Sequence, residues 1–577
     1  MPTVAELYRA RRDDDHVGLL TVDRSWTWRE VIAECEARAA LLATLRRAGP
    51  FHLGVLLENV PEYLFLLGGA ALAGAAVVGI NPTRRGEELA RDVRHTDCQL
   101  VVTATDQAGL LDGLDIGVEA VRVLVSDTDE YTELVSAAAA GGGATNAGAD
   151  DAPGDDAPGD DAVPPSPDTL YLLLFTSGST GAPKAVRVSQ GRAAEAAIAM
   201  ASGSGFGPGD VMYCAMPLFH GNALHTCVDP AVASGATLVL RRRFSASGFL
   251  PDVRRFGATY FNYVGRALAH ILATPAQPDD GDNTLKFAFG TDASPQDMVA
   301  FRRRFACPVV EGYGSSEGAI SMSRGPGTPR QALGKPPPGT DVVILDPDTG
   351  LERAVAEIDP HGRLLNAADA IGEIVSRDGV PRFEGYYANP EADAERTRGG
   401  WFWSGDLGYR DAAGYFYFAG RTADWLRVDG ENFAAAPVER ILERFDGVVT
   451  AVVVPFPDPR TGDQVLAVLE LRPDAVFDPE SFASFLQAQP DLGTKWAPRF
   501  VRVTSQIPLT GTGKVDKRPL RAPPWATGDP VWWRPFLGRD AHVAGADANE
   551  YRLFTSEDAE ELEEAFTEHD RGALLQM

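Results

Sequence analysis

Residues 170–192 read LYLLLFTSGSTGAPKAVRVSQGR, and this stretch decides the fold class. The apolar run Leu170–Phe175 is typical of a buried strand. It leads directly into Thr176–Lys184, where small hydroxyl residues and glycines let amides and hydroxyls converge on phosphate oxygens and the lysine adds a cation. The glycine spacing and the proline before the lysine exclude a P-loop of the Walker A type. The sequence therefore predicts a different phosphate-binding loop after a buried strand.

Short β-rich runs alternate with Ala- and Leu-rich helical stretches on both sides of this loop, which is typical of an α/β architecture. Beyond Gly420–Arg421 the pattern changes to strands around one helix, which predicts a small α+β domain. The expected strands are Phe51–Leu57, Leu100–Ala104, Val121–Val125, Leu170–Phe175, Thr237–Leu240, Thr450–Pro455 and Gln464–Leu471, and the expected C-terminal helix is Pro437–Phe445.

Tyr63–Ile80 contains no charged residue, so its length alone would allow a transmembrane helix. Half of the segment is Gly and Ala, however. We interpret it as a buried helix that runs through Ala73, a break at Gly74 and a short strand at Ala75–Gly79.

The domain organisation follows from changes in composition. Residues 1–420 are expected to form a large N-terminal domain, residues 421–534 a small mobile domain, and residues 535–577 an acidic tail. Within the first, residues 141–166 form an acidic low-complexity loop, because repeated DDAPG units cannot bury enough surface to fold. In the tail, Thr555 is expected to cap a short amphipathic helix, Glu557–Glu568.

Charge and cysteine content narrow the class of protein. The formal net charge of −28 argues against sequence-independent binding of nucleic acid. The five cysteines form no CxxC pair and indicate neither a zinc site nor a disulfide framework, which fits a reducing compartment. The charged segment Met1–Arg12 lacks the apolar region of a signal peptide, so a cytoplasmic protein is expected.

Four further motifs follow in the chain: Gly290–Ala293 (GTDA), Glu311–Glu317 (EGYGSSE), Trp403–Asp406 (WSGD) and Pro508–Lys514 (PLTGTGK). Together with Thr176–Lys184 they resemble, in the right order, the motifs of the ANL superfamily of adenylate-forming enzymes. That superfamily comprises acyl-CoA synthetases, luciferases and the adenylation domains of peptide synthetases. The resemblance covers residues 3 to about 520 and implies a large multi-subdomain N-terminal adenylate-forming domain with a small mobile C-terminal domain.

The resemblance implies roles for individual residues. Tyr313 would stack on adenine, Asp406 would accept the ribose hydroxyls, and Glu317 with Thr176 would hold Mg²⁺ against the phosphates. Lys514, Thr176 and Glu317 would be the catalytic residues. The Lys514 cation would stabilise negative charge that develops in the transition state. Ser316 stands where the family usually has Thr. The expected ATP-binding residues are Thr176, Ser177, Gly178, Ser179, Thr180, Gly181, Lys184, Gly290, Thr291, Asp292, Ala293, Glu311, Gly312, Tyr313, Gly314, Ser315, Ser316, Asp406, Arg421 and Lys514.

Two further stretches indicate a particular group within the ANL superfamily. Arg421–Asn432 (RTADWLRVDGEN) and Ala258–Gly265 (ATYFNYVG) look like the bacterial FadD-type fatty-acyl-CoA ligases and the fatty-acid-transport-protein group of very-long-chain acyl-CoA synthetases. Ala423 stands where many relatives have a charged hinge residue, which puts the pivot in doubt. By resemblance the acyl substrate would meet His220, Tyr263, Asp292 and Gly314, and coenzyme A would meet Arg427, Gly430, Glu431 and Asn432.

These parts predict an AMP-forming acyl-CoA ligase that uses ATP, Mg²⁺ and coenzyme A. One alternative keeps adenylation but activates nitrite for N–N bond formation with an amine, since Asp292 would suit a polar substrate. The other is a lipid-binding or transport module without catalysis. The expected partners are a small-molecule acid, ATP and CoA, without nucleic acid. Peripheral membrane association, a homodimer and the identity of the acid stay open.

Overall fold

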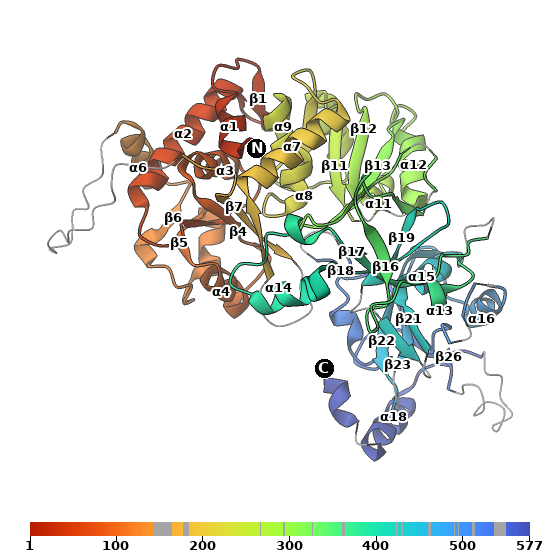
Figure 1. The fold of residues 1–577 in the computed structure, drawn as a ribbon. Coiled ribbons are helices and arrows are strands. Elements are labelled where there is room, and N and C mark those ends of the chain that lie inside the picture. Colours follow the sequence, from red (N-terminus) through yellow and green to blue (C-terminus); the bar gives the residue numbers. More distant parts are fainter. Residues whose placement is uncertain are drawn as a thin grey trace. The chain divides into compact units, whose positions relative to one another are not determined.

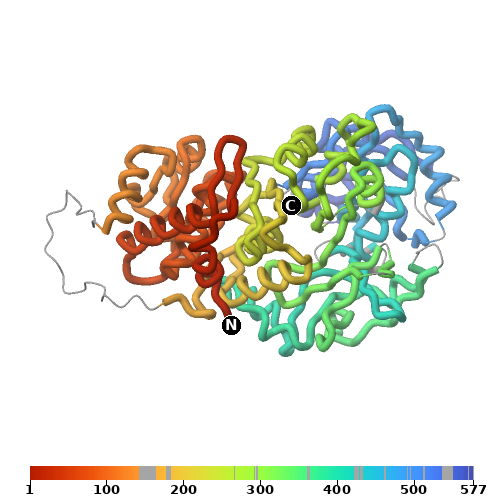
Figure 2. The backbone as a smooth tube through the Cα atoms, turned by 90° about the horizontal axis from the view of Figure 1, so that it is seen from above, coloured from red at the N-terminus to blue at the C-terminus, as the bar shows by residue number. Residues whose placement is uncertain are grey.

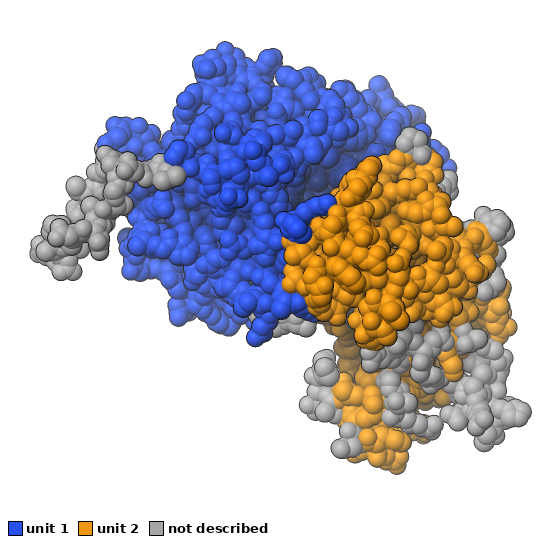
Figure 3. Space-filling model, viewed as in Figure 1, with its two compact units in different colours: residues 1–318, 381–395, 511–513 blue, residues 319–380, 396–510, 514–577 orange. Residues whose placement is uncertain are grey.

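The computed structural model describes the chain except for residues 142–163, 177–183, 266, 292, 294, 326, 330, 360–363, 422–424, 429–430, 460–462, 490, 494, 511–513, 536–549, 570 and 577. Most of the expected acidic loop, 141–166, lies outside the described residues. The chain divides into two compact units, which Figure 3 colours separately. Unit 1 comprises residues 1–318, 381–395 and 511–513, and unit 2 comprises residues 319–380, 396–510 and 514–577.

The first sheet of unit 1 is parallel apart from one edge hairpin. Its order is β6-β5-β3-β4-β7-β8, and only β8 pairs antiparallel, with β7. Alternate residues point to opposite faces, so Leu53 and Val55 join one core with the helices α2 and α3, whereas Leu56 joins another with α4. The elements are α2 Trp28–Leu45, β3 His52–Leu56, α3 Pro61–Ala73, β4 Ala76–Gly79, α4 Gly86–His95, β5 Cys98–Thr103, β6 Val123–Val125, α6 Asp129–Ala139, β7 Leu170–Thr176 and β8 Lys184–Ser189.

The second sheet of unit 1 carries most of the predicted substrate residues. Within unit 1 its order is β13-β12-β11-β9-β10-β1-β2, parallel except for β2. In Figure 2, β9 to β13 lie in the yellow to green part of the chain, whereas β1 and β2 of the same sheet are red. The elements are α1 Val4–Arg9, β1 Val17–Leu20, β2 Ser25–Thr27, α7 Gln190–Ser204, β9 Val211–Cys214, α8 Gly221–Ala223, the π-helical turn η3 Leu224–Val228, α9 Asp229–Ser234, β10 Thr237–Leu240, α10 Phe249–Phe256, β11 Tyr260–Val264, α11 Ala267–Leu272, β12 Phe287–Thr291, α12 Pro295–Phe305 and β13 Val309–Gly314.

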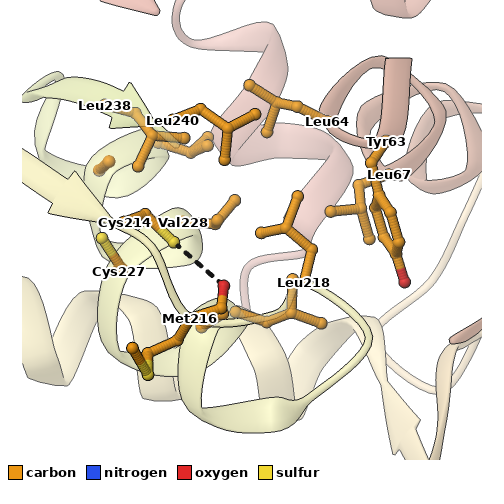
Figure 4. Close-up of a cluster of buried hydrophobic side chains, with 14 of the residues drawn as sticks. Tyr63, Leu64, Leu67, Cys214, Met216, Leu218, Cys227, Val228, Leu238 and Leu240 are labelled. Carbon is orange, nitrogen blue, oxygen red and sulfur yellow. Dashed lines mark hydrogen bonds between the residues drawn. The ribbon is translucent and has the colours of Figure 1, made fainter. Parts of the chain in front are cut away.

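The uncharged segment Tyr63–Ile80 is a buried helix followed by a strand, as predicted. α3 ends at Ala73 because Gly74 adopts φ +70°, a conformation that glycine takes without steric cost. β4 then begins at Ala76 in the middle of the first sheet. Tyr63, Leu64 and Leu67 of α3 belong to the same buried core as Leu238 and Leu240 of β10, and Figure 4 shows Leu64 next to Leu240. No helix in the described part of the chain is long and apolar enough to cross a membrane.

Unit 2 contains two five-stranded sheets and a hairpin. The first sheet is antiparallel, in the order β15-β19-β18-β17-β16, and the second runs β22-β23-β24-β25-β26. Part of segment 535–577 belongs to this second sheet, because β26 pairs with β25 and Leu562 and Phe566 of α18 are buried in its core. The elements are β15 Ala332–Gly334, β16 Val342–Leu345, β17 Gly372–Ser376, β18 Phe402–Arg410, β19 Phe416–Arg421, β20 Trp425–Val428, β21 Glu431–Ala434, α15 Ala435–Leu442, β22 Val448–Pro457, β23 Asp463–Leu471, α16 Pro479–Gln487, β24 Phe500–Thr504, β25 Val531–Trp533, β26 Arg552–Leu553 and α18 Ser556–Glu568. The helix α14, Pro390–Arg396, lies in unit 1 except for its last residue.

Of two helices predicted in unit 2, one has its predicted cap and the other has different bounds. α18 has the predicted cap: Thr555 and Asp558 form a reciprocal capping box. The helix expected at Pro437–Phe445 instead spans Ala435–Leu442. Pro437 lies within the first turn, where its missing N–H costs nothing. Tighter turns follow the helix, with Phe445 N–H donating to Leu442 O, and they end its regular geometry earlier than the pattern suggests.

Candidate active site

Three predicted residues meet at the carboxyl ends of neighbouring parallel strands, where ligands of α/β sheets usually bind. We call Tyr263, Gly290 and Glu311 the strand-end platform. The pairing sets Tyr263 of β11 beside Gly290 of β12, and Gly290 beside Glu311 of β13. Tyr263 Oη donates to Glu311 Oε1 at 3.1 Å, and the Ala293 amide donates to the same oxygen at 2.8 Å.

Gly290 is required for this arrangement. A Cβ atom at this position would lie 2.4 Å from Tyr263 O and 2.6 Å from its ring. The tyrosine ring therefore rests directly on the glycine backbone, and Tyr263 is fully buried. The remaining predicted residues of this edge continue the same strands or follow them directly: Thr291, Ala293, Gly312, Tyr313, Gly314, Ser315 and Ser316.

The two ends of the predicted phosphate loop are brought together by a hairpin. Thr176 of β7 pairs with Lys184 of β8, and Thr176 Oγ1 donates to Lys184 O at 3.4 Å. The Lys184 ammonium lies 3.3 Å from Glu395 Oε2 and 5.8 Å from the centre of the Tyr386 ring. An ion pair and a ring thus hold this cation at the base of the loop.

Glu317, the predicted magnesium ligand, is buried and accepts a hydrogen bond from Tyr386 Oη at 2.7 Å. Arg192 donates to the carbonyl oxygen of Ser316, the residue before Glu317. Arg192 also lies next to Glu384, which accepts a hydrogen bond of 2.5 Å from Ser189 Oγ. Burial lowers the pKa of Arg192, and the carboxylates of Glu384 and Glu317 oppose that effect. The sequence analysis missed Tyr386, Arg192 and Glu384, because their partners are distant in sequence.

The predicted acyl residue His220 begins the helical segment after β9. It caps α8, and its ring centre lies 4.3 Å from that of Phe219. Next to it, Asn222 Oδ1 accepts from Asn262 Nδ2 at 2.9 Å, so two side chains that the sequence analysis missed tie α8 to β11. Asn222 Nδ2 also lies 3.5 Å from Tyr263 O, which connects this segment to the strand-end platform.

In unit 2, Asp406 lies within β18, directly after a glycine in the left-handed region. Gly405 adopts φ +73° and its amide donates to Glu373 Oε1 at 2.7 Å, while the Asp406 amide donates to Ser404 Oγ at 3.0 Å. Burial raises the pKa of Glu373, and the Gly405 amide opposes that rise. Asp406 pairs with Arg421 of β19, so two residues of the expected ATP site are neighbours in the sheet. Glu373 is a further residue that the motifs did not reveal.

The other predicted residues of unit 2 lie on hairpins. Arg427 pairs with Asn432 across β20 and β21, next to Glu431. Lys514 is exposed; its amide donates to Thr510 Oγ1 at 3.2 Å and its carbonyl accepts from the Thr510 amide at 2.7 Å. Ser177, Gly178, Ser179, Thr180, Gly181, Asp292, Ala423 and Gly430 lie outside the described residues, and so do the side chains of Arg421, Arg427, Glu431 and Asn432.

Two family profiles match this chain in succession. The AMP-binding enzyme profile matches residues 8–387, and the profile of the AMP-binding enzyme C-terminal domain matches residues 437–514. The chain belongs to the AMP-binding enzyme family. The first match contains the strand-end platform, the Thr176–Lys184 hairpin and Glu317, and the second ends at Lys514. The predicted domain boundary at residues 420–421 falls between the two matches and stays a prediction.

Relatives within the AMP-binding family are similar over almost the whole chain. A steroid-22-oyl-CoA synthetase from Rhodococcus jostii is 53% identical over 99% of both chains. The medium/long-chain-fatty-acid–CoA ligase FadD17 from Mycobacterium tuberculosis is 44% identical over 92% of this chain and 98% of its own. Among solved structures, ATP-bound MatB from Rhodopseudomonas palustris has the same fold, with a TM-score of 0.74 at 22% identity over 90% of this chain and 97% of its own.

The protein is therefore an AMP-forming acyl-CoA ligase of the ANL superfamily, which joins an acid to coenzyme A through an acyl-adenylate. Its substrates are a small-molecule acid, ATP and CoA, and Mg²⁺ accompanies ATP. These relatives do not favour nitrite activation or a non-catalytic lipid carrier. No cluster of three or more His, Cys, Asp or Glu that could hold a metal occurs in the described residues. A single carboxylate such as Glu317 suits Mg²⁺, which takes most of its ligands from phosphates and water.

Proposed function

We propose that the acid is a steroid carboxylate, with the acyl carbon at the end of a short side chain. The observation that carries this proposal is the 53% identity, over 99% of both chains, with a steroid-22-oyl-CoA synthetase. A medium- or long-chain fatty acid is the second candidate, because FadD17 fatty-acid ligases are 43–44% identical over 92% of the chain.

The two candidate acids need acyl sites of different shape. A fused-ring body is rigid and broad, and so it loses little conformational entropy on binding, whereas an alkyl chain needs a long narrow channel. The segment Gly221–Ser234, which follows His220, includes a π-helical turn rather than a continuous α-helix. Such turns often alter the wall of a functional site. This departure supports a substrate of unusual shape.

The residue roles belong to the same proposal. Mg²⁺ would lower the negative charge of the triphosphate. The Thr176–Lys184 loop and Lys514 would bind the phosphates while a carboxylate oxygen of the acid attacks the α-phosphorus and pyrophosphate leaves. Tyr313 would hold the adenine and Asp406 the ribose. The small domain would then turn about residues 421–424, so that Arg427–Asn432 replaces Lys514 and the CoA thiolate attacks the acyl carbon.

The test is a substrate comparison with the full-length protein. Pyrophosphate release and thioester formation would be measured with a steroid 22-oic acid and with fatty acids of graded length, each with and without CoA. We expect kcat/KM to be at least about tenfold higher for the steroid acid, a difference of ~1.4 kcal/mol in transition-state binding. A preference for a fatty acid would replace the first candidate with the second. Nitrite with an amine serves as a control that should release no pyrophosphate.

The location and assembly of the protein are predictions as well. We expect it to act in the cytoplasm, and peripheral membrane association with a lipid substrate and homodimerisation stay open. Cell fractionation followed by sedimentation of the purified protein checks all three.

A further inference from the structure

A histidine–aspartate pair lies in the helical segment that follows His220. His225 belongs to the π-helical turn η3 and Asp229 is the first residue of α9. His225 Nδ1 lies 3.1 Å from Asp229 Oδ2, and the two side chains are 23% and 3% exposed. The expected roles of the catalytic motifs use neither residue.

The turn that carries this pair is anchored on its other side. Figure 4 shows Cys227 and Val228, the last residues of η3, buried close to Cys214 and Met216. His225, in the same turn, is only half-buried. An anchored π turn fixes the direction of the side chains that it carries, and such turns are frequent at functional sites.

Asp229 needs a hydrogen-bonding partner. Its surroundings are Tyr8 and Tyr171, both fully buried, and its charge contributes to the raised pKa of each. Burial raises the pKa of Asp229 itself, and the hydrogen bond with His225 opposes that rise. The hydrogen bond with the imidazole is therefore the contact that stabilises this buried carboxylate.

The orientation of the ring leaves one nitrogen for a ligand. Nδ1 is bonded to Asp229, so only Nε2 remains. Among the described residues, His225 Nε2 makes no hydrogen bond. In imidazole Nε2 is bonded to Cδ2, and Cδ2 lies 3.3 Å from the point where a Cβ of Gly221 would be.

The same point lies close to two other segments. It is 3.5 Å from Ser316 Oγ and 3.3 Å from Leu174 Cδ1. Ser316 directly precedes Glu317, and Leu174 lies two residues before Thr176, so both neighbours belong to the segments expected to hold the phosphates. Gly221 thus lies between the imidazole on one side and these two segments on the other.

We propose that His225, held by Asp229, binds the carboxylate of the acid substrate through Nε2 and aligns it for attack on the α-phosphorus. The hydrogen bond is charge-assisted, which makes it short and directional. Because Gly221 has no side chain, the imidazole lies directly beside the backbone that separates it from Ser316 and Leu174. This assignment rests on the proposed function, because the site is defined by the expected positions of acid and phosphates.

The experiment compares an acid with its uncharged analogue in matched variants. The ligands are a steroid 22-oic acid and the corresponding 22-alcohol, which competes with the acid but lacks the carboxylate. The variants are His225→Asn, whose amide matches the position of Nδ1, and His225→Gln, whose amide reaches the position of Nε2. In His225→Asn we expect the KM for the acid to rise about tenfold or more, as for a lost hydrogen bond to a charged group. The Ki of the alcohol and the KM for ATP should change less than about twofold, since neither contact uses Nε2. His225→Gln should recover much of the loss.

Two results would overturn the assignment: an equal loss for acid and alcohol, which would mark His225 as a structural residue, or no loss in either variant. A thermal melt of each variant shows whether it is folded. Asp229→Asn, which keeps the volume and a hydrogen bond, should also raise the KM for the acid more than the Ki of the alcohol. If the wild-type protein prefers fatty acids, the first proposal fails but this one does not. The ligand pair then becomes decanoate and decanol, and the comparison of His225→Asn with His225→Gln is read in the same way.

Discussion

The candidate site draws on two kinds of structure. The strand-end platform of unit 1 is built on parallel strands, where the pairing of Tyr263, Gly290 and Glu311 fixes each position. In unit 2, Asp406 is likewise paired in a sheet, with Arg421, whereas Lys514 is exposed and its backbone is bonded to Thr510. A paired sheet holds a ligand in one place, whereas exposed connecting segments can approach and withdraw. The difference predicts that the paired residues supply binding and that Lys514 acts in only one half-reaction.

Replacing the lysine of the exposed loop tests this division most severely. Lys514→Ala should slow adenylate formation by roughly a hundredfold or more, because charge stabilisation in the transition state is lost. With preformed acyl-adenylate and CoA, thioester formation should proceed at near the wild-type rate. Single-turnover kinetics of each half-reaction measures both. Lys286→Ala, which removes a surface lysine paired with Asp210, is the control and should affect neither step.

Gly430→Trp is the complementary change, on the face expected to meet CoA. Adenylate should accumulate while thioester formation fails, because the indole blocks the approach of the thiol. Equal loss of both steps in a folded Lys514→Ala protein would rule out a division of labour between the two faces of unit 2.

A side chain added to the platform should damage both binding and stability. Gly290→Ala forces its Cβ against Tyr263 O, so we expect a loss of about 1–3 kcal/mol in the free energy of unfolding. Because misplacement near 1 Å costs about a hundredfold in rate, adenylation should fall by up to that amount. Denaturant unfolding and pyrophosphate release are the measurements. Gly203→Ala in α7, where nothing lies within 4 Å, should leave both unchanged or raise stability slightly.

Two adjacent tyrosines offer a smaller and more selective test. Tyr386→Phe removes the hydrogen bond to Glu317, so the concentration of Mg²⁺ for half-maximal rate should rise about tenfold, as for a lost bond to a charged group. Tyr387→Phe removes an equally short bond to Asp97 and should leave the Mg²⁺ dependence unchanged. The same shift in both variants would mean that Tyr386 acts on the fold and not on Glu317.

The smallest effect is expected from the acidic repeat. Replacing residues 149–164 with a brief Gly/Ser linker should leave turnover and stability nearly unchanged, because closing a long surface loop costs little more than closing a short one. Activity and thermal unfolding of the shortened protein check this. A large loss of turnover would show that the repeat takes part in the reaction.

The sequence predicted the class of fold and most motif positions because both depend on local patterns. β10 has the bounds that its apolar run predicted, and Thr555 caps α18 as its pattern required. The supporting contacts could not be predicted in the same way. Tyr386 reaches Glu317, and Glu373 reaches Gly405, from sequence positions far from the motifs. His225 belongs to no motif, and nothing in the local sequence shows that its segment contains a π turn.

Unit 1 is not continuous in the sequence: residues 381–395 complete it after a long excursion into unit 2. On the ribosome, the first 318 residues therefore emerge before residues 381–395, which contain Tyr386 and Glu384. Glu317 therefore has no hydrogen bond from Tyr386 until synthesis has passed residue 386. At about 5–20 residues per second, this delay lasts several seconds. The nascent chain can bury most of its first two sheets in that time, but the contact between Tyr386 and Glu317 forms only after residues 319–380 of the other unit have been made.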